Sequence, residues 1–259
     1  MIVIKDLSKS FGKHKVLDNI NLKIEKGKIT IIMGGSGCGK STLLKHLIGA
    51  LKPDKGEILV EGNDITKMDE NSLDNIRKKF GMLYQNGALF NSMSVGENVA
   101  LPLREHTKLD NKIIEIVVKM KLELVGLTGF NELFPSQISG GMKKRVALAR
   151  AIALDPQVVF YDEPGAGLDP VTRSVIDKLI ADLSKKLNIT SVVVTHEMGS
   201  AFTIADKIAM VHQGKIIANG TISEIKNSEN EVVQQFISGS PEGPLTRQRS
   251  GKEYLESLT

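Results

Sequence analysis

The sequence predicts an α/β fold that carries a helical insertion, and three observations support this prediction. Short apolar runs at 29–33, 158–161 and 191–194 are typical of strands that are buried on both faces. Helix-like patterns alternate with such runs in the first and last thirds of the chain. Between 69 and 155 the texture is helical. We therefore expect an α/β domain with an α-helical subdomain inserted into it.

The first third of the chain contains strand, turn and helix signals in order. Apolar and polar residues alternate over 20–24, which is the period of a half-buried strand. The apolar run at 29–33 ends in glycines, and a helical run follows at 42–48. Glycines bound a further strand at 56–62. This order predicts a strand–turn–helix unit followed by another strand.

The later elements are predicted by the same reasoning. Apolar residues are so dense over 113–120 that we expect this helix to be well buried. Further helices are predicted at 142–154 and 172–187, and a hairpin at 208–217. At 239 the composition shifts to Ser, Pro, Gly and basic residues. We expect residues 239–259 to form a C-terminal tail that does not join the core.

The composition excludes several classes of protein. Hydrophobic residues make up 41% of the 259 residues and charged residues 25%, which is the balance of a globular protein rather than a disordered one. No apolar run approaches the roughly 20 residues of a membrane-spanning helix. One cysteine cannot form an internal disulfide or a multi-cysteine zinc site. The net charge of +4 is spread over mixed signs, without a basic block, so we expect a soluble cytoplasmic protein with no nucleic-acid partner.

A phosphate-binding motif follows the strand at 29–33. The pattern G-x-x-x-x-G-K-[ST] is matched by Gly34, Gly35, Ser36, Gly37, Cys38, Gly39, Lys40 and Ser41. Glycines allow backbone N–H groups to converge on one anion, and the next helix adds the positive end of its dipole. Lys40 would bind the β- and γ-phosphates, the Ser41 hydroxyl would bind Mg²⁺, and Thr42 would reach the α-phosphate. The sequence therefore predicts a nucleoside triphosphate site.

Cys38 lies inside this motif, and two interpretations of it stay open. The start of the following helix could lower the pKa of the thiol and make it reactive toward thiol reagents. Alternatively, cysteine is present because a small residue fits the loop.

Two adjacent carboxylates end the second buried strand. Asp162 would hold Mg²⁺ through water at the end of the run 158–161. Glu163 would face the γ-phosphate and orient or deprotonate the attacking water. A strand that delivers both groups beside a phosphate loop predicts hydrolysis of the bound nucleotide.

A second helix start can also bind phosphate. Ser139 is a plausible N-cap, and Gly140 and Gly141 open the helix that follows. This segment lies about 100 residues beyond the phosphate loop. If the two helix starts are too far apart for one ATP, each ATP must be shared between two chains.

These motifs together resemble the ATPase subunits of ABC transporters. Their order and spacing match the Walker A motif (34–41), Q-loop (Gln85), signature (Ser139, Gly140 and Gly141), Walker B motif (Asp162 and Glu163), D-loop (167–169) and switch histidine (His196). The resemblance covers residues 1 to about 238. It implies a P-loop NTPase in which a RecA-like core with an antiparallel β subdomain (1–85 and 156–238) carries an α-helical signature subdomain (86–155). The signature reads Ile-Ser-Gly-Gly-Met instead of the usual Leu-Ser-Gly-Gly-Gln, so its fifth position lacks an amide.

The resemblance implies further contacts with Mg²⁺ and ATP. Phe11 would stack on the adenine, with Val16 packed beside it. Gln85 would contact Mg²⁺ or the attacking water and sense a membrane partner, and His196 would contact the γ-phosphate.

It also implies a homodimer that encloses two ATP molecules. Lys40 of one copy would share each nucleotide with Ser139, Gly140 and Gly141 of the other copy, and Asp169 would lie at the interface between them.

Within this family, four segments resemble the Mla-type ATPases of phospholipid transport between bacterial inner and outer membranes. These segments are 87–106, 139–150, 164–170 and 238–244. After Pro244 the chain departs from that group. The resemblance implies a peripheral protein on the cytoplasmic face of the inner membrane, with an integral permease, a periplasmic lipid-binding protein and a small cytoplasmic accessory subunit as partners.

Residues 86–106 would then form the groove that receives a helix of the permease. We expect apolar side chains to line it, with Leu89, Phe90, Met93 and Val95 as candidates. Three alternatives stay open: an ABC ATPase that acts on DNA or ribosomes, a regulatory ATP-binding module without turnover, and a transporter ATPase with another small-molecule cargo.

Overall fold

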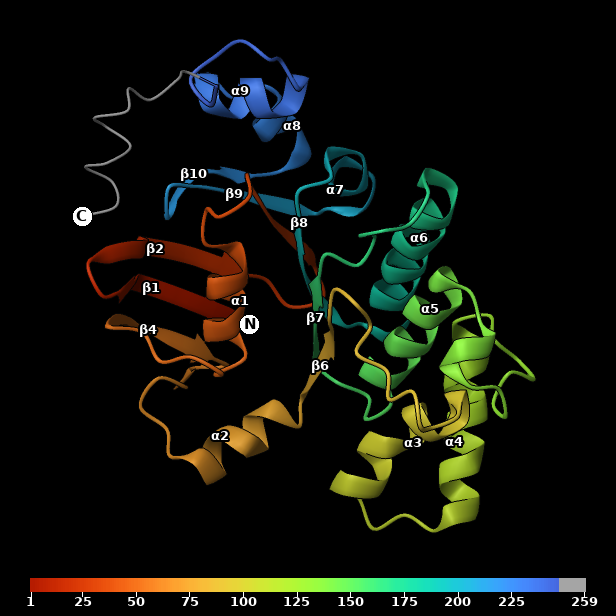
Figure 1. Cartoon of the computed structure of the whole chain (residues 1–259). Helices are drawn as coiled ribbons and strands as arrows, with labels where there is room; N and C mark the ends of the chain where they lie inside the picture. Colours follow the sequence, from red (N-terminus) through yellow and green to blue (C-terminus); the bar gives the residue numbers. More distant parts are fainter. Residues whose placement is uncertain (247–259) are drawn as a thin grey trace. The chain divides into compact units, whose positions relative to one another are not determined.

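The computed structural model describes residues 1–246, and its elements follow the expected α/β order (Figure 1). In this part of the chain the strands are β1 (Ile2–Phe11), β2 (His14–Ile24), β3 (Ile29–Met33), β4 (Lys55–Val60), β5 (Asn63–Asp64), β6 (Phe80–Leu83), β7 (Val158–Asp162), β8 (Thr190–Thr195), β9 (Lys207–His212) and β10 (Lys215–Gly220). The helices are α1 (Lys40–Leu47), α2 (Glu70–Arg77), α3 (Val95–His106), α4 (Asn111–Leu124), α5 (Gly140–Ala151), α6 (Pro170–Leu187), α7 (Met198–Ile204), α8 (Ile222–Lys226) and α9 (Glu231–Ser238). The α/β prediction is confirmed. Within the described range, no helix combines the length and apolar character that crossing a bilayer would require.

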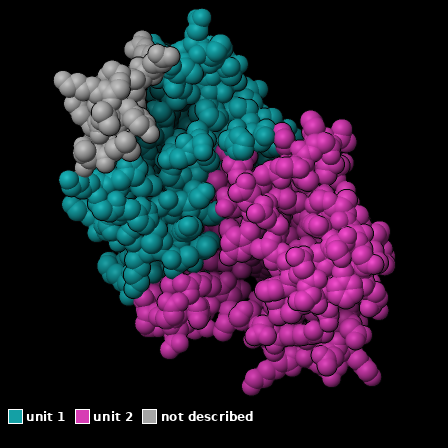
Figure 2. Space-filling model, in the orientation of Figure 1, with its two compact units in different colours: residues 1–25, 30–67, 196–259 teal, residues 26–29, 68–195 magenta. Residues whose placement is uncertain are grey.

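The chain divides into two compact units, which Figure 2 shows in different colours. Unit 1 consists of 1–25, 30–67 and the segment that starts at 196. Unit 2 consists of 26–29 and 68–195. Each unit is thus built from segments that are far apart in the sequence. The subdomain boundaries at 86 and 155 stay a prediction.

Unit 1 combines an antiparallel sheet with strands of a second sheet. The antiparallel sheet has the order β2-β1-β4-β5, with Ile2 opposite both Ile24 and Val60. Its expected alternation is present, because buried apolar residues recur along β2 between polar ones. Strand β9 pairs antiparallel with β10 and parallel with β3. The parallel pairing matters for function because the phosphate loop follows β3 directly.

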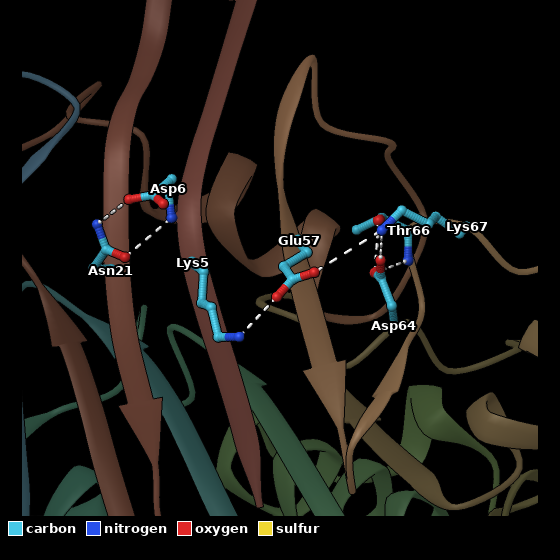
Figure 3. A network of polar contacts seen from close by, with 7 residues as sticks. All are labelled: Lys5, Asp6, Asn21, Glu57, Asp64, Thr66 and Lys67. Carbon is cyan, nitrogen blue, oxygen red and sulfur yellow. Dashed lines mark hydrogen bonds and ion pairs between the residues drawn. The ribbon is translucent and has the colours of Figure 1, made fainter.

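Polar contacts support the irregular part of the antiparallel sheet (Figure 3). Asp6 has a φ of 50°, where the register between β1 and β2 shifts. The Asn21 amide accepts a hydrogen bond from the Asp6 backbone N–H and donates one to the Asp6 carboxylate, both at 3.0 Å. Farther along, Lys67 lies 2.7 Å from Asp64 and 3.9 Å from Glu57. The Asn21 side chain thus satisfies the Asp6 backbone N–H, which the bulge removes from the hydrogen-bond ladder between the strands.

Unit 2 combines parallel strands with a group of helices. Strand β7 pairs in parallel with β6 and β8, and its residues Val158 to Tyr161 are fully buried. The Phe80 ring meets the Phe160 ring edge-on at 5.1 Å. Helices α3, α4 and α5 contact one another. This buried strand is the rigid support from which Asp162 and Glu163 follow.

Helix α4 is half exposed, which corrects the expectation that it is well buried. Its buried face consists of Ile114, Val118, Lys121 and Leu122. Ile113, Ile116 and Met120 are 45%, 55% and 58% exposed. The helix is buried along one stripe only, because residues at a spacing of four share a face while their apolar neighbours turn outward.

The start of the predicted C-terminal tail is attached to α9. The Gln235 side chain of α9 is 6% exposed. Its amide donates to the Ser240 carbonyl at 3.1 Å and to the Thr246 hydroxyl at 3.2 Å, and its oxygen accepts from the Leu245 N–H at 2.7 Å. Residues 239–246 are themselves exposed or half-buried, and the expectation that 239–259 stays outside the core remains a prediction. The rest of the predicted tail, 247–259, lies outside the described residues.

Candidate functional site

The phosphate loop of unit 1 curls around the ammonium group of its own lysine. Lys40 Nζ donates to the carbonyl oxygens of Gly34 at 2.9 Å and Gly35 at 2.8 Å, and the residue is buried. Gly39 is the N-cap of α1 with a φ of 106°, and no side chain among the described residues caps it. The helix start therefore presents backbone N–H groups and a positive charge to the same loop, as a phosphate site requires.

Close approach of the backbone dictates two of the loop glycines. A Cβ at Gly34 would lie 2.1 Å from the carbonyl oxygen of Val211 in β9. A Cβ at Gly39 would lie 2.9 Å from the carbonyl oxygen of Val16 and 2.8 Å from the Leu17 side chain. The structure thus brings Val16 directly beside the loop, and its contact with adenine stays a prediction.

The residues fit a nucleotide with a magnesium ion. Ser41 is exposed in the first turn of α1, where its hydroxyl is accessible. Within 1–246, no group of three or more His, Cys, Asp or Glu side chains could hold a metal ion by itself. Mg²⁺ typically takes one or two protein oxygens together with phosphate and water, so a hydroxyl and a carboxylate are an adequate protein contribution. Ser41 of unit 1 is such a hydroxyl, and the contribution of Asp162, which belongs to unit 2, stays a prediction.

A cavity of about 610 Å³ adjoins the phosphate loop in unit 1. Its lining includes Val16 and residues 35–38, together with Phe236 and Leu245 from the C-terminal part of the chain. Phe11 is 52% exposed at the end of β1, with the Lys9 ammonium 5.6 Å from its ring centroid. An exposed ring at this hairpin is available to stack on a base, and its contact with adenine stays a prediction.

Cys38 is a buried thiol. It is 8% exposed, and burial raises the pKa of this thiol while the positive charge of Lys40 acts in the opposite direction. The interpretation of Cys38 as an acidic, reactive thiol is therefore wrong. The alternative holds, because its Sγ fills the space next to Gly34, 2.9 Å from where a Cβ there would be.

In unit 2, Glu163 adopts a strained backbone conformation directly after β7. Its φ is 46°, in the left-handed region that non-glycine residues rarely adopt. Its N–H donates to the carbonyl oxygen of Val194 at 2.9 Å, and the Thr195 hydroxyl donates to its carboxylate at 3.2 Å. The strand end next to β7 thus fixes both the backbone and the side chain of Glu163.

Gln85 lies on an exposed loop that α5 holds by its backbone. The ammonium group of Lys144, a buried residue of α5, donates to the Gln85 carbonyl oxygen. Burial lowers the pKa of Lys144, and the negative charges of Asp162 and Glu163 oppose this change. Arg150 donates to the carbonyl oxygens of the next residues along the loop, Gly87 at 2.7 Å and Ala88 at 2.8 Å.

The signature residues open α5 next to the start of α6. The Ser139 hydroxyl caps α5 by accepting from the Met142 N–H at 3.3 Å. A Cβ at Gly141 would lie 2.6 Å from Thr172 Cγ2 of α6, so packing alone already requires glycine there. Asp169 caps α6 through the N–H groups of Val171 and Thr172, and these contacts lower the pKa of its carboxyl, the Thr172 side chain most.

The predicted site residues are divided between the two units. Unit 1 holds Phe11, Val16, the phosphate loop and His196, whereas unit 2 holds Gln85, the signature, Asp162, Glu163 and Asp169. His196 is exposed, and its Nε2 lies 3.9 Å from a Glu197 carboxylate oxygen. The structure brings Val16 to the phosphate loop, and Thr195 to Glu163.

Two residues near the site escaped the sequence analysis. Thr195 directly precedes the predicted switch histidine, His196. Its place next to a predicted site residue could have identified it from the sequence. Lys144 follows the signature, but nothing in its sequence context indicates that it reaches the Q-loop. Both become visible only through contacts between residues that are far apart in the sequence.

A groove in unit 2 adjoins the predicted permease-binding segment. It has a volume of about 850 Å³, and its lining includes Tyr84, Phe90, Pro102 and Arg150. Phe90 is 50% exposed, as a docking residue should be. The other candidates do not line this groove. Val95 is fully buried in α3, whereas Leu89 and Met93 are half-buried.

Comparison with known proteins identifies the family. The ABC transporter family model matches residues 17–166. The chain is 46% identical to the intermembrane phospholipid transport system ATP-binding protein MlaF of Haemophilus influenzae, over 100% of this chain and 98% of that protein. It is 44% identical to MlaF of Escherichia coli K12, over 100% and 96%. A dimeric ATP-binding cassette solved in a post-hydrolysis state with ADP and phosphate has a TM-score of 0.78 at 31% identity, and the match covers 86% of this chain and 99% of that one. The chain therefore belongs to the ABC transporter family, as one of its ATP-hydrolysing subunits.

Proposed function

We propose that this chain powers phospholipid transport between the inner and outer membranes of a bacterium. The observation that carries the proposal is that its likeness to the MlaF proteins extends over 100% of this chain and over 98% and 96% of those two proteins. The phosphate-binding motifs are common to ABC ATPases of every cargo and are silent on this point. The cargo assignment therefore rests on the remainder of the sequence, including 87–106 and 238–244.

The proposed hydrolysis mechanism assigns one role to each predicted site residue. Lys40 and the first N–H groups of α1 bind the phosphates. Glu163, oriented by Thr195, accepts a proton from the attacking water, and His196 contacts the γ-phosphate. Ser41, Asp162 and Gln85 would hold Mg²⁺, which would supply positive charge to neutralise the phosphates. The backbone of Glu163 is fixed, so its carboxylate stays in one position. A carboxylate held in one position accepts a proton more readily than one whose side chain moves freely.

The second phosphate-binding helix start requires a second copy of the chain. In the proposed homodimer, Ser139, Gly140 and Gly141 of one copy contact the ATP held by Lys40 of the other, and Asp169 lies at the interface. The dimeric cassette similar to this chain supports this arrangement. ATP would stabilise the closed dimer, because both phosphate-binding helix starts are engaged only in that state.

Coupling to transport needs a membrane partner. In the proposed complex, the groove beside Phe90 and Tyr84 receives a helix of an integral permease. The chain then lies peripherally on the cytoplasmic side of the inner membrane. A periplasmic lipid-binding protein and a small cytoplasmic accessory subunit complete the assembly.

Co-purification tests this proposal. The full-length chain would carry an N-terminal tag in its own cell, membranes would be extracted in mild detergent, and mass spectrometry would identify captured proteins and lipids. We expect a multi-spanning permease with bound phospholipid. Phe90→Glu is the comparison variant. It places a charge on an exposed groove residue, and we expect it to abolish capture of the permease. Capture of a permease loaded with amino acids or metal ions would overturn the phospholipid assignment.

A further inference from the structure

The segment 85–88 is held against α5 by an unusual set of contacts. Lys144, Ala147 and Arg150 recur at a spacing of three, so they lie along one face of the helix. Lys144 donates to the Gln85 carbonyl oxygen, and Arg150 donates through both terminal nitrogens to the Gly87 and Ala88 carbonyl oxygens, at 2.7 and 2.8 Å. Two cations of one helix thus bind three carbonyl groups of one loop.

The backbone of this loop has an uncommon shape, which these contacts stabilise together with a hydrogen bond from the Gly87 N–H to the Tyr84 carbonyl oxygen at 2.8 Å. Gly87 and Ala88 both have positive φ values, 72° and 48°. Two successive left-handed residues are costly unless their surroundings fix them, the more so when one is alanine. A Cβ at Gly87 would lie 3.5 Å from the Ala147 Cβ, so the loop runs directly against the helix.

The same helix begins at the signature. Ser139 caps α5, and Lys144 follows within about one and a half turns. If the loop moves while these contacts persist, it therefore carries the start of α5 with it. Lys144 also feels the negative charges of Asp162 and Glu163. One buried ammonium group therefore stands between the Q-loop, the signature helix and the carboxylate end of β7.

We propose that Lys144 is a positioning residue for ATP hydrolysis, which together with Arg150 locks the Q-loop backbone to the signature helix so that the two move as one body. Lys144 does not touch ATP in this proposal. It fixes where Gln85 stands relative to Glu163, and it transmits displacement of the loop to Ser139, Gly140 and Gly141. The inference rests on the roles proposed above for Gln85 and Glu163.

The test compares three variants of the full-length chain. Lys144→Met removes the ammonium group at nearly constant length, Lys144→Arg keeps a cation, and Lys143→Met is the matched control, because it deletes the same charge one residue earlier. Amide hydrogen exchange of 85–88 and steady-state ATPase kinetics are measured for each, and thermal unfolding confirms that each is folded. If Lys144→Met does not fold, Lys144→Gln takes its place, since it is polar and shorter.

We expect Lys144→Met to speed exchange of 85–88 and to lower kcat, each by about tenfold, while the KM for ATP changes less than about threefold. Lys144→Arg should restore both quantities, and Lys143→Met should change neither. Unchanged exchange of 85–88 in a folded Lys144→Met protein would overturn the inference, as would an equal effect of Lys143→Met. Failure of the hydrolysis mechanism itself would appear separately, as undiminished turnover in Glu163→Gln.

Discussion

Individual residues carry features that composition and spacing do not reveal. The sequence was sufficient to single out Glu163, because a carboxylate after an apolar strand is a recognisable pattern. Its left-handed backbone was not predictable in the same way. A φ of 46° costs a non-glycine residue about 1 kcal/mol. The strain persists because Val194 and Thr195 bind the residue from the neighbouring strand. Contacts of this kind depend on the folded chain, and no local pattern predicts them.

His46 makes the free energy of unfolding depend on pH. It is 1% exposed in α1, its Nδ1 lies 2.7 Å from the Thr42 carbonyl oxygen, and burial lowers its pKa. The unfolded chain therefore binds a proton more readily than the folded one. The stability is fully present above about pH 6.5 and falls as the pH drops through that value, by at most about 1.4 kcal/mol per pH unit.

Urea unfolding between pH 7.5 and 5.5 would measure this dependence. We expect the parent chain to lose more stability over the interval than His46→Gln, in which position 46 no longer titrates. Equal slopes in the two proteins would contradict the assignment.

At the scale of elements, the start of α5 serves packing as well as the phosphate binding proposed for it. Gly141→Ala would place a Cβ 2.6 Å from Thr172 Cγ2, so the Thr172 side chain or one of the two helices must shift. Overpacking of this kind costs about 1–3 kcal/mol. Thr172→Ser removes the clashing methyl group but keeps the hydroxyl that contacts Asp169. We therefore expect thermal unfolding to show a lowered Tm in Gly141→Ala and a recovered Tm in the double variant. A Tm that stays low in the double variant would mean that the clash is not the cause.

Elements differed in how well their sequence predicted them. Strands β3 and β7 were placed correctly because each is a continuous apolar run that only a buried strand can accommodate. Helix α4 was correctly predicted as a helix but not in its burial, since density of apolar residues does not say how many faces a neighbour covers. The contact of α5 with the Q-loop was not predictable, because it joins residues about 60 positions apart through cations that look like ordinary surface charges.

At the scale of the whole molecule, the proposed mechanism makes the closed dimer an intermediate that hydrolysis removes. Glu163→Gln should keep ATP binding and lose turnover, since a general base contributes roughly 10²–10⁴-fold. The ATP-bound dimer should then accumulate, which size-exclusion chromatography with Mg-ATP can detect. Lys40→Ala is the control, because it removes phosphate binding and should remain monomeric under the same conditions. A Glu163→Gln protein that binds ATP but elutes only as a monomer would refute the shared site.

The interleaving of the two units has a consequence for recombination between relatives. Unit 2 is almost one continuous stretch of chain, 68–195, whereas unit 1 is assembled from what precedes and follows it. A gene exchange with crossovers after Lys67 and after Thr195 would transplant the Q-loop, signature and general base as a set. The recipient would keep its own phosphate loop and switch histidine. Such a chimera would combine unit 2 of one parent, with the groove proposed for the permease, and unit 1 of the other, with the phosphate loop. A single crossover would instead divide unit 1 between the two parents.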